Sequence, residues 1–314
     1  MSHPINQLTQ ARMIPAEFSG ELAGHRFLMT SVRTGNTEIF LIDPYTGSAT
    51  NLTSSPASHQ RYPSWAPDGT KIAFTSDRDG AYNLYVMDAD GGDVRKLTSV
   101  SAPQVVYFPG WSGDGRRIVF GLAGCEPPLM CEVDANGGGY RVLGEGRDPY
   151  LSPDGKLLAF TQYMGSGYSV FLMETNDGRV TRITEHENPF GAVTPTFSPD
   201  GKSILYSDST GNALELYRVS VDTGEPRQMT ALGQFATCAG WSPDMQWISF
   251  RVTDEDFWNH ADRMRLAYAE RRPDKRPVWV MRADASEPHP LEALRYQCGI
   301  DGSRAVWDPL GASK

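Results

Sequence analysis

Three arginines stand three or four residues ahead of a short motif that recurs along the chain. Arg61 and Arg147 come four residues before Trp65 and Leu151, and Arg304 comes three residues before Trp307. A guanidinium group binds carboxylate or phosphate oxygens through two parallel hydrogen bonds. If the fold brings these positions together, the chain presents a cluster of positive charge to an acidic ligand.

Residues next to these arginines extend the candidate site. Tyrosines there could stack on a sugar ring, or they could simply pack between structural units. Acidic neighbours could line the same site, or they could neutralise the arginines in local salt bridges. The candidate ligand-binding set is Arg61, Tyr62, Tyr107, Arg147, Asp148, Glu187, Arg295, Tyr296, Gln297 and Arg304.

Two histidines supply a second possible chemistry. His59 and His186 lie in the same class of segment, and with Gln297 they could hold a divalent metal ion through nitrogen and oxygen ligands. Without a metal, the two histidines could act as a catalytic acid and base. The alternative is that both are ordinary surface histidines.

The elements that position these residues repeat. The sequences WAPDG, WSGDG, LSPDG, FSPDG, WSPDM and WDPLG begin at the anchors Trp65, Trp111, Leu151, Phe197, Trp241 and Trp307. Apolar or aromatic residues follow the first five anchors after seven and nine positions, which is the alternation of a half-buried strand. Asp and Gly are what tight turns require, so we interpret the motif as structural rather than catalytic.

Each repeat contains about four short strands in 40 to 46 residues, the period of a propeller blade. The segments before Trp65 supply three strands of a blade, and the segment around Trp307 supplies one. The sequence therefore predicts an all-β, six-bladed propeller of four-stranded antiparallel blades, in which the C-terminal strand completes the N-terminal blade. Such closure removes exposed sheet edges.

The repeated pattern SPDGKxIxF…LYxMDxDGG…LT resembles that of TolB-type six-bladed β-propellers. The resemblance covers residues 25–309, and leaves an N-terminal extension (1–24) and a tail (310–314). TolB proteins are periplasmic partner proteins with an additional N-terminal domain. Oligogalacturonate lyases are similar, more distant propellers, and that resemblance implies a divalent metal held by several histidines near the channel.

Loops that run from the outermost strand of one blade to the innermost strand of the next surround one end of the central channel. Binding residues concentrate on loops carried by a rigid frame. We expect the candidate residues on this rim, in the segments 55–63, 101–109, 144–149, 185–195, 231–239 and 292–305.

One insertion interrupts the regular spacing. Phe250 is 28 residues from Val278, whereas the matching pair Phe74 and Leu84 is ten residues apart. The residues 253–276 have helical periodicity and contain many arginines. They predict a short amphipathic helix in blade six, either a lid over the channel or a decoration of the blade.

Composition limits the remaining possibilities. The 314 residues carry a net charge of −9, which argues against a general nucleic-acid binder. No apolar run is long enough to span a membrane, no signal peptide is evident, and four cysteines are too few for a disulfide framework. We expect a cytoplasmic protein that binds neither nucleic acid nor membranes.

Two functions follow from these residues. The first is a recognition propeller whose arginine-rich channel mouth binds an acidic small molecule, such as a sugar acid, or an acidic segment of a protein partner. The second is a lyase or isomerase for a carboxylated, sugar-like substrate, with His59 and His186 as catalytic residues and possible help from a divalent metal ion. The first is preferred because the catalytic set is incomplete.

Overall fold

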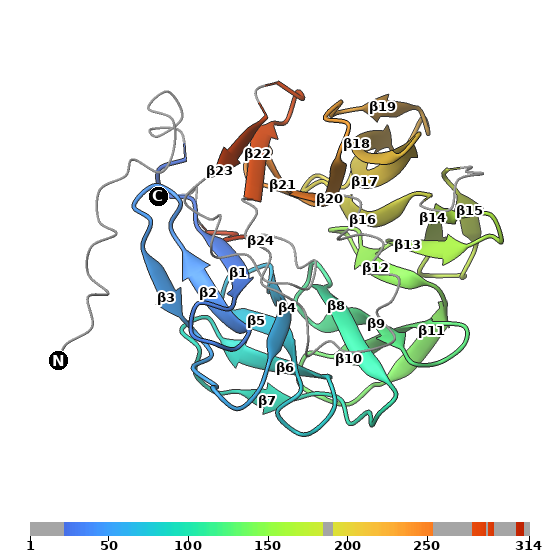
Figure 1. Cartoon of the computed structure of the whole chain (residues 1–314). Helices are drawn as coiled ribbons and strands as arrows, with labels where there is room; N and C mark the ends of the chain where they lie inside the picture. The colour runs from blue at the N-terminus through green and yellow to red at the C-terminus, as the bar shows by residue number, and fades with distance from the viewer. Residues whose placement is uncertain (1–21, 185–190, 254–277, 287, 292–305, 311–314) are drawn as a thin grey trace.

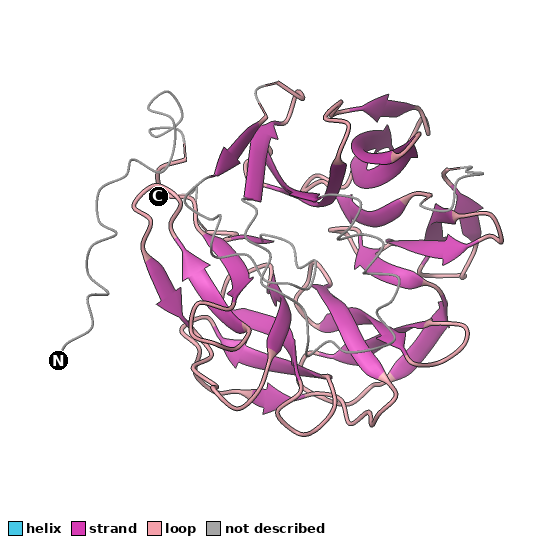
Figure 2. Cartoon of the chain, in the orientation of Figure 1, coloured by secondary structure: helices cyan, strands magenta, loops and turns pink. Residues whose placement is uncertain are grey.

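The computed structural model describes residues 22–184, 191–253, 278–286, 288–291 and 306–310. All regular structure in these ranges is β-strand, and they contain no helix (Figure 2). The sheets are arranged radially around a common centre (Figure 1). The all-β prediction is confirmed.

Four of the sheets have four strands each, paired antiparallel. The first contains β24 (Val306–Trp307), β1 (Phe27–Ser31), β2 (Glu38–Ile42) and β3 (Ala49–Asn51). The second contains β4 (Gln60–Trp65), β5 (Lys71–Ser76), β6 (Asn83–Asp88) and β7 (Arg95–Lys96). The third contains β8 (Val105–Trp111), β9 (Arg117–Ala123), β10 (Leu129–Asp134) and β11 (Arg141–Glu145). The fourth contains β12 (Arg147–Leu151), β13 (Leu157–Tyr163), β14 (Tyr168–Glu174) and β15 (Val180–Arg182).

The fifth sheet has eight strands and joins two antiparallel groups through one parallel contact between β18 and β20. One group contains β16 (Val193–Phe197), β17 (Ser203–Thr210), β18 (Ala213–Ser220) and β19 (Pro226–Gln228). The other contains β20 (Phe235–Trp241), β21 (Trp247–Thr253), β22 (Val278–Arg282) and β23 (His289–Leu291).

The repeated motif sets the register of the innermost hairpins. Each of the first five anchors lies opposite the apolar residue seven positions later, as Trp65 pairs with Ile72 and Phe197 with Ile204. The motif serine holds the turn, because Ser198 Oγ donates to Asp200 at 2.6 Å and accepts from the Ser203 amide at 3.0 Å. The structural interpretation of the motif is therefore supported by its own hydrogen bonds.

Threonines near the outer strands make a second repeated contact. The hydroxyls of Thr53, Thr98, Thr184 and Thr230 each accept a hydrogen bond of 2.9–3.0 Å from the amide of a residue in the third strand of their own blade. These bonds pair backbone donors that burial would otherwise leave unsatisfied. They hold the chain in place just after the outermost strand of these four blades.

The core lies between neighbouring groups of strands. One apolar cluster packs Leu28 and Ile39 of the first sheet against Phe74 of the second. Another packs Phe27 of β1 and Trp307 of β24 against Val280 of β22. The first and last parts of the described chain therefore share a hydrophobic core.

The short strand β24 connects the two ends of the described chain. Leu28 and Phe27 of β1 pair antiparallel with Val306 and Trp307. The Trp307 indole N–H also donates to the Gly240 carbonyl of β20 at 3.2 Å. The C-terminal strand thus lies between β1 and β20.

The predicted helix at 253–276 is not supported. All of its residues after Thr253 lie outside the described residues, and the described part of the chain has no helix.

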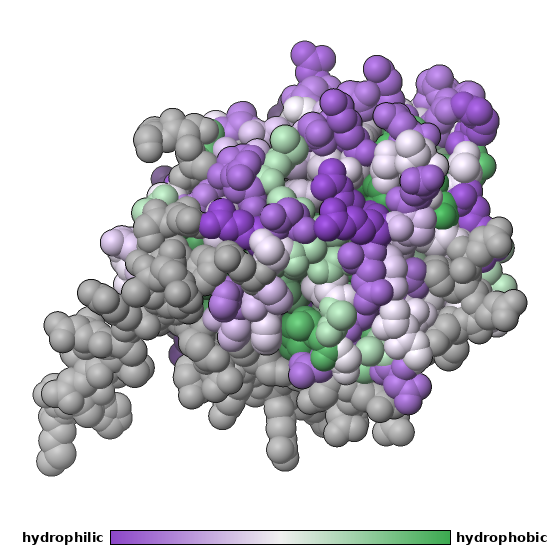
Figure 3. Space-filling view, turned by 90° about the horizontal axis from the view of Figure 1, so that it is seen from above, coloured by the Kyte–Doolittle hydropathy of each residue, from purple (hydrophilic) through white to green (hydrophobic). Residues whose placement is uncertain are grey.

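One side of the described surface is mainly hydrophilic with separate apolar spots (Figure 3). A search of the same described residues finds no helix long and apolar enough to cross a membrane.

Candidate functional site

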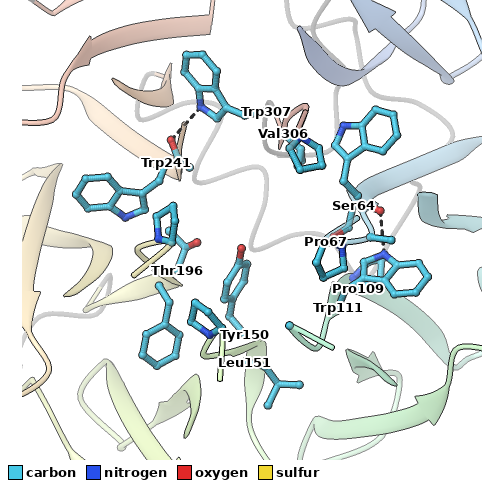
Figure 4. Close-up of a pocket in the computed structure, with 18 of the residues that line it drawn as sticks. Ser64, Pro67, Pro109, Trp111, Tyr150, Leu151, Thr196, Trp241, Val306 and Trp307 are labelled. Carbon is cyan, nitrogen blue, oxygen red and sulfur yellow. Dashed lines mark hydrogen bonds between the residues drawn. The ribbon is translucent and has the colours of Figure 1, made fainter. Parts of the chain in front are cut away.

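The innermost strands enclose a cavity of about 440 Å³ (Figure 4). Residues from β4, β8, β12, β16, β20 and β24 all contribute to its wall. Aromatic residues and prolines make up most of the lining. The Tyr150 side chain points into the middle of the cavity, whereas the rings of Trp111, Trp241 and Trp307 point away from it (Figure 4). Such a wall favours an apolar or aromatic group, because binding sites are mostly apolar with a few placed polar groups.

The cavity wall combines residues of the predicted rim segments with residues of the motif turns. Tyr62, Phe108 and Asp148 belong to the predicted segments 55–63, 101–109 and 144–149. Motif prolines such as Pro67 and Pro153, which follow the innermost strands, line the cavity as well.

Five of the six innermost strands that line the cavity have a bulge at one place. Pairing slips between Arg61 and Ser64 in β4, and at matching positions in β8, β12, β16 and β20. One residue in each bulge has a positive φ, between 46° and 55°: Tyr62, Phe108, Asp148, Thr194 and Cys238. A bulge redirects the side chains on either side of it. Tyr62, Phe108 and Asp148 line the cavity.

Arg61 and Arg147 lie directly before the bulges and have equivalent contacts. The Arg61 guanidinium lies 4.9 Å from the ring centre of Tyr82, and that of Arg147 lies 5.5 Å from the ring centre of Tyr168. Arg147 also donates to the Tyr168 hydroxyl at 3.1 Å. Neither arginine lines the cavity, and Arg61 is buried.

The tyrosines that hold these arginines were missed from the sequence. Tyr82 and Tyr168 both lie 17 residues after the anchors Trp65 and Leu151. That shared spacing was the available signal. Stacking of a guanidinium on an aromatic face is a favourable contact that also fixes the direction of the side chain.

Tyr107 occupies the same position in β8 as the two arginines in their strands. Its ring lies over Gly121 of β9, where a Cβ atom would come within 2.3–2.7 Å of three ring carbons. Tyr107 does not line the cavity, although Phe108 beside it does. Of the described part of the predicted ligand set, Tyr62 and Asp148 line the cavity, whereas Arg61, Tyr107 and Arg147 do not.

His59 contacts residues at strand ends in the first two sheets. Its Nδ1 lies 3.3 Å from the Thr37 hydroxyl, and its amide donates to Asp77 at 2.7 Å. Among the described residues, no group of three or more His, Cys, Asp or Glu side chains could hold a metal ion. His186 and Gln297, the other predicted ligands, lie outside the described residues.

Two stretches of the chain, residues 7–149 and 142–272, match the model of the TolB β-propeller domain. Together they cover more than half of the chain. The chain belongs to the TolB β-propeller family.

Curated relatives of this TolB-family chain match only parts of it. It is 32% identical over 137 residues to the "uncharacterized peptidase YuxL" of Bacillus subtilis, a match that covers 43% of this chain and 20% of the relative. It is 29% identical over 160 residues to the "protein TolB homolog" of Chlorobium luteolum, covering 50% of this chain and 36% of the relative. The chain thus spans between a fifth and about a third of these relatives.

Solved structures extend the likeness over most of the fold. A TolB-type structure from Agrobacterium tumefaciens has a TM-score of 0.68 at 20% identity, and the match covers 91% of this chain and 95% of that chain. An oligogalacturonate lyase in complex with manganese has a TM-score of 0.59 at 18% identity, covering 85% of this chain and 73% of that chain. At such identities the likeness shows the fold alone.

The second half of the site predicted for this TolB-family chain is not described. His186, Glu187, Arg295, Tyr296, Gln297 and Arg304 all lie outside the described residues. The described geometry tests the first half only, and it brings Tyr62 and Asp148 to the cavity wall.

Proposed function

We propose that this chain is a recognition propeller that binds a carboxylate-bearing ligand with an apolar or aromatic body in the central cavity. The observation that carries the proposal is the cavity of about 440 Å³, which the innermost strands line mainly with aromatic residues and prolines. Aromatic walls bind flat apolar groups, and nearby charged groups select among them.

The charge of the ligand is inferred from the arginines at the bulges. Arg61 and Arg147 immediately precede Tyr62 and Asp148, which line the cavity. Two guanidinium groups and one carboxylate, that of Asp148, give a net positive charge at the bulges of β4 and β12. Tyr82 and Tyr168 hold both arginines, so their positive charges stay fixed next to the bulges.

The arrangement of the blades belongs to the same proposal. We infer a ring of six blades over residues 25–309, closed where β24 joins β1. The pairing of Leu28 with Val306 and the bond from Trp307 to Gly240 support closure. A closed ring fixes the spacing of the innermost strands, and therefore the width of the cavity.

Calorimetric titration with three probes tests the function. We expect 2-naphthoate to bind more tightly than 2-naphthylmethanol, which has the same ring system without the charge. Arg147→Gln should weaken 2-naphthoate binding severalfold and leave the alcohol unchanged, since it removes a positive charge beside the cavity without changing the residues that line it. Arg179→Gln is the control, because Arg179 pairs with Glu174 at the outer edge of the same blade.

A peptide arm distinguishes a free ligand from a segment of a protein partner. The peptide acetyl-Glu-Trp-Glu-amide carries the same combination of carboxylate and aromatic ring. Tighter binding of the peptide than of 2-naphthoate favours a partner segment, and the reverse favours a small acid. If none of the three probes binds, the proposal is wrong.

The lyase or isomerase alternative remains a prediction. It requires His59 together with His186, and only His59 is described. A cytoplasmic location likewise remains a prediction.

A further inference from the structure

The five bulge residues combine an unfavourable backbone with side chains of five different kinds. Tyr62, Phe108, Asp148, Thr194 and Cys238 occupy the same position in five repeats, three residues before the anchor, with φ between 46° and 55°. A positive φ is uncommon for any residue with a side chain, and for a β-branched residue such as Thr194 it is an outlier.

Glycine adopts a positive φ without strain, and this chain has glycine at other positions that need a positive φ. In the motif turn, the position that needs a positive φ is Gly69, Gly115, Gly155 and Gly201 in four repeats and Met245 in the fifth. At the bulge, none of the five described repeats has glycine. Strained residues that are retained in this way are concentrated at binding sites.

From this contrast we propose that the bulge residues that line the cavity, Tyr62, Phe108 and Asp148, form its specificity ring: their side chains, and not the repeated framework residues, select the ligand. The assignment rests on the proposed function, because it presumes that the cavity binds a ligand. It adds Phe108 to the site, and it assigns to Asp148 the discrimination between anionic and cationic ligands.

Contacts around the bulges support the assignment. The rings of Tyr62 and Phe108, on adjacent innermost strands, lie 4.5 Å apart, so bulge side chains of neighbouring blades meet. Both line the cavity, as does Asp148. Thr194 and Cys238 are buried as well, but neither is among the residues that line the cavity.

Two variants separate selectivity from folding. Asp148→Asn keeps the shape of the side chain and removes its charge. We expect it to shift the ratio of affinities for 2-naphthoate and 2-naphthylmethylamine about tenfold toward the acid, because a carboxylate near the ligand favours cations. Met245→Gly is the control, since it changes a positive-φ residue in a motif turn and should leave the ratio unchanged.

The outcomes distinguish this assignment from the proposed function. If the wild type binds neither naphthyl compound, the proposed function fails and the assignment with it. If the wild type binds but Asp148→Asn leaves the affinity ratio unchanged, only the specificity ring is overturned.

Discussion

Replacement of Gly121 by alanine tests how the third sheet supports the cavity. An added Cβ would lie 2.3, 2.6 and 2.7 Å from three carbons of the Tyr107 ring. Unbonded carbons prefer about 3.5–4.0 Å, so the ring must move by roughly 1 Å. The ring also meets Phe108, with centroids 5.8 Å apart, and Phe108 lines the cavity.

The expected cost follows from two opposing effects. Forcing an extra methyl group into a packed site costs about 1–3 kcal/mol. Alanine in a strand regains about 0.5–1 kcal/mol relative to glycine, because the unfolded chain has less freedom to lose. We therefore expect Gly121→Ala to lower the free energy of unfolding by about 0.5–2 kcal/mol, and the thermal midpoint by a few degrees.

A double-mutant cycle isolates the contact with the ring. Tyr107→Val removes the ring and reproduces the residue that β16 has at the same position, Val193. Urea unfolding followed by tryptophan fluorescence would give the four free energies. We expect Gly121→Ala to be neutral or stabilising in the Tyr107→Val background. If the alanine costs the same in both backgrounds, contact with the Tyr107 ring is not the cause.

Three further predictions concern the repeated framework, and each is checked by the midpoint of thermal unfolding. Ser198→Ala should lower the free energy of unfolding by about 1 kcal/mol. The hydrogen bond from Ser198 is the main cause of the lowered pKa of Asp200, so its stabilising effect is present above the unfolded pKa of Asp200 and is lost as pH falls through the folded pKa. The variant should therefore approach the stability of the wild type in acid. Thr184→Val should lower the free energy of unfolding by about 1–3 kcal/mol, because the buried amide of Val170 loses its hydrogen-bond acceptor. Trp307→Phe should cost about 1 kcal/mol, because it deletes the bond from β24 to β20.

The repeat made most of the framework predictable from the sequence. An anchor and an apolar residue seven positions later are enough to align the two innermost strands, and Trp65 does pair with Ile72. Turn chemistry was equally readable, since Ser198 and Asp200 bond as the motif suggests. These features depend on local spacing, which the sequence contains directly.

The site was less predictable because the bulges interrupt that spacing. Counting four residues back from an anchor assumes regular alternation, but the pairing of β4 slips between Arg61 and Ser64. The residue that reaches the cavity is therefore Tyr62 rather than Arg61. A signal was present in the prolines that follow the bulge residue in four repeats, such as Pro63 and Pro109, because proline within a strand marks a bulge.

Departures from the repeat are therefore the better guide to function in this chain. Where four of five repeats share one residue type, as with the motif serine, a common hydrogen bond explains the choice. Where five repeats share a strained backbone but no side chain, the common geometry cannot explain the variety. For Tyr62, Phe108 and Asp148, which line the cavity, the variety fits the proposed specificity, because a single ligand would contact different blades with different groups and need different chemistry from each.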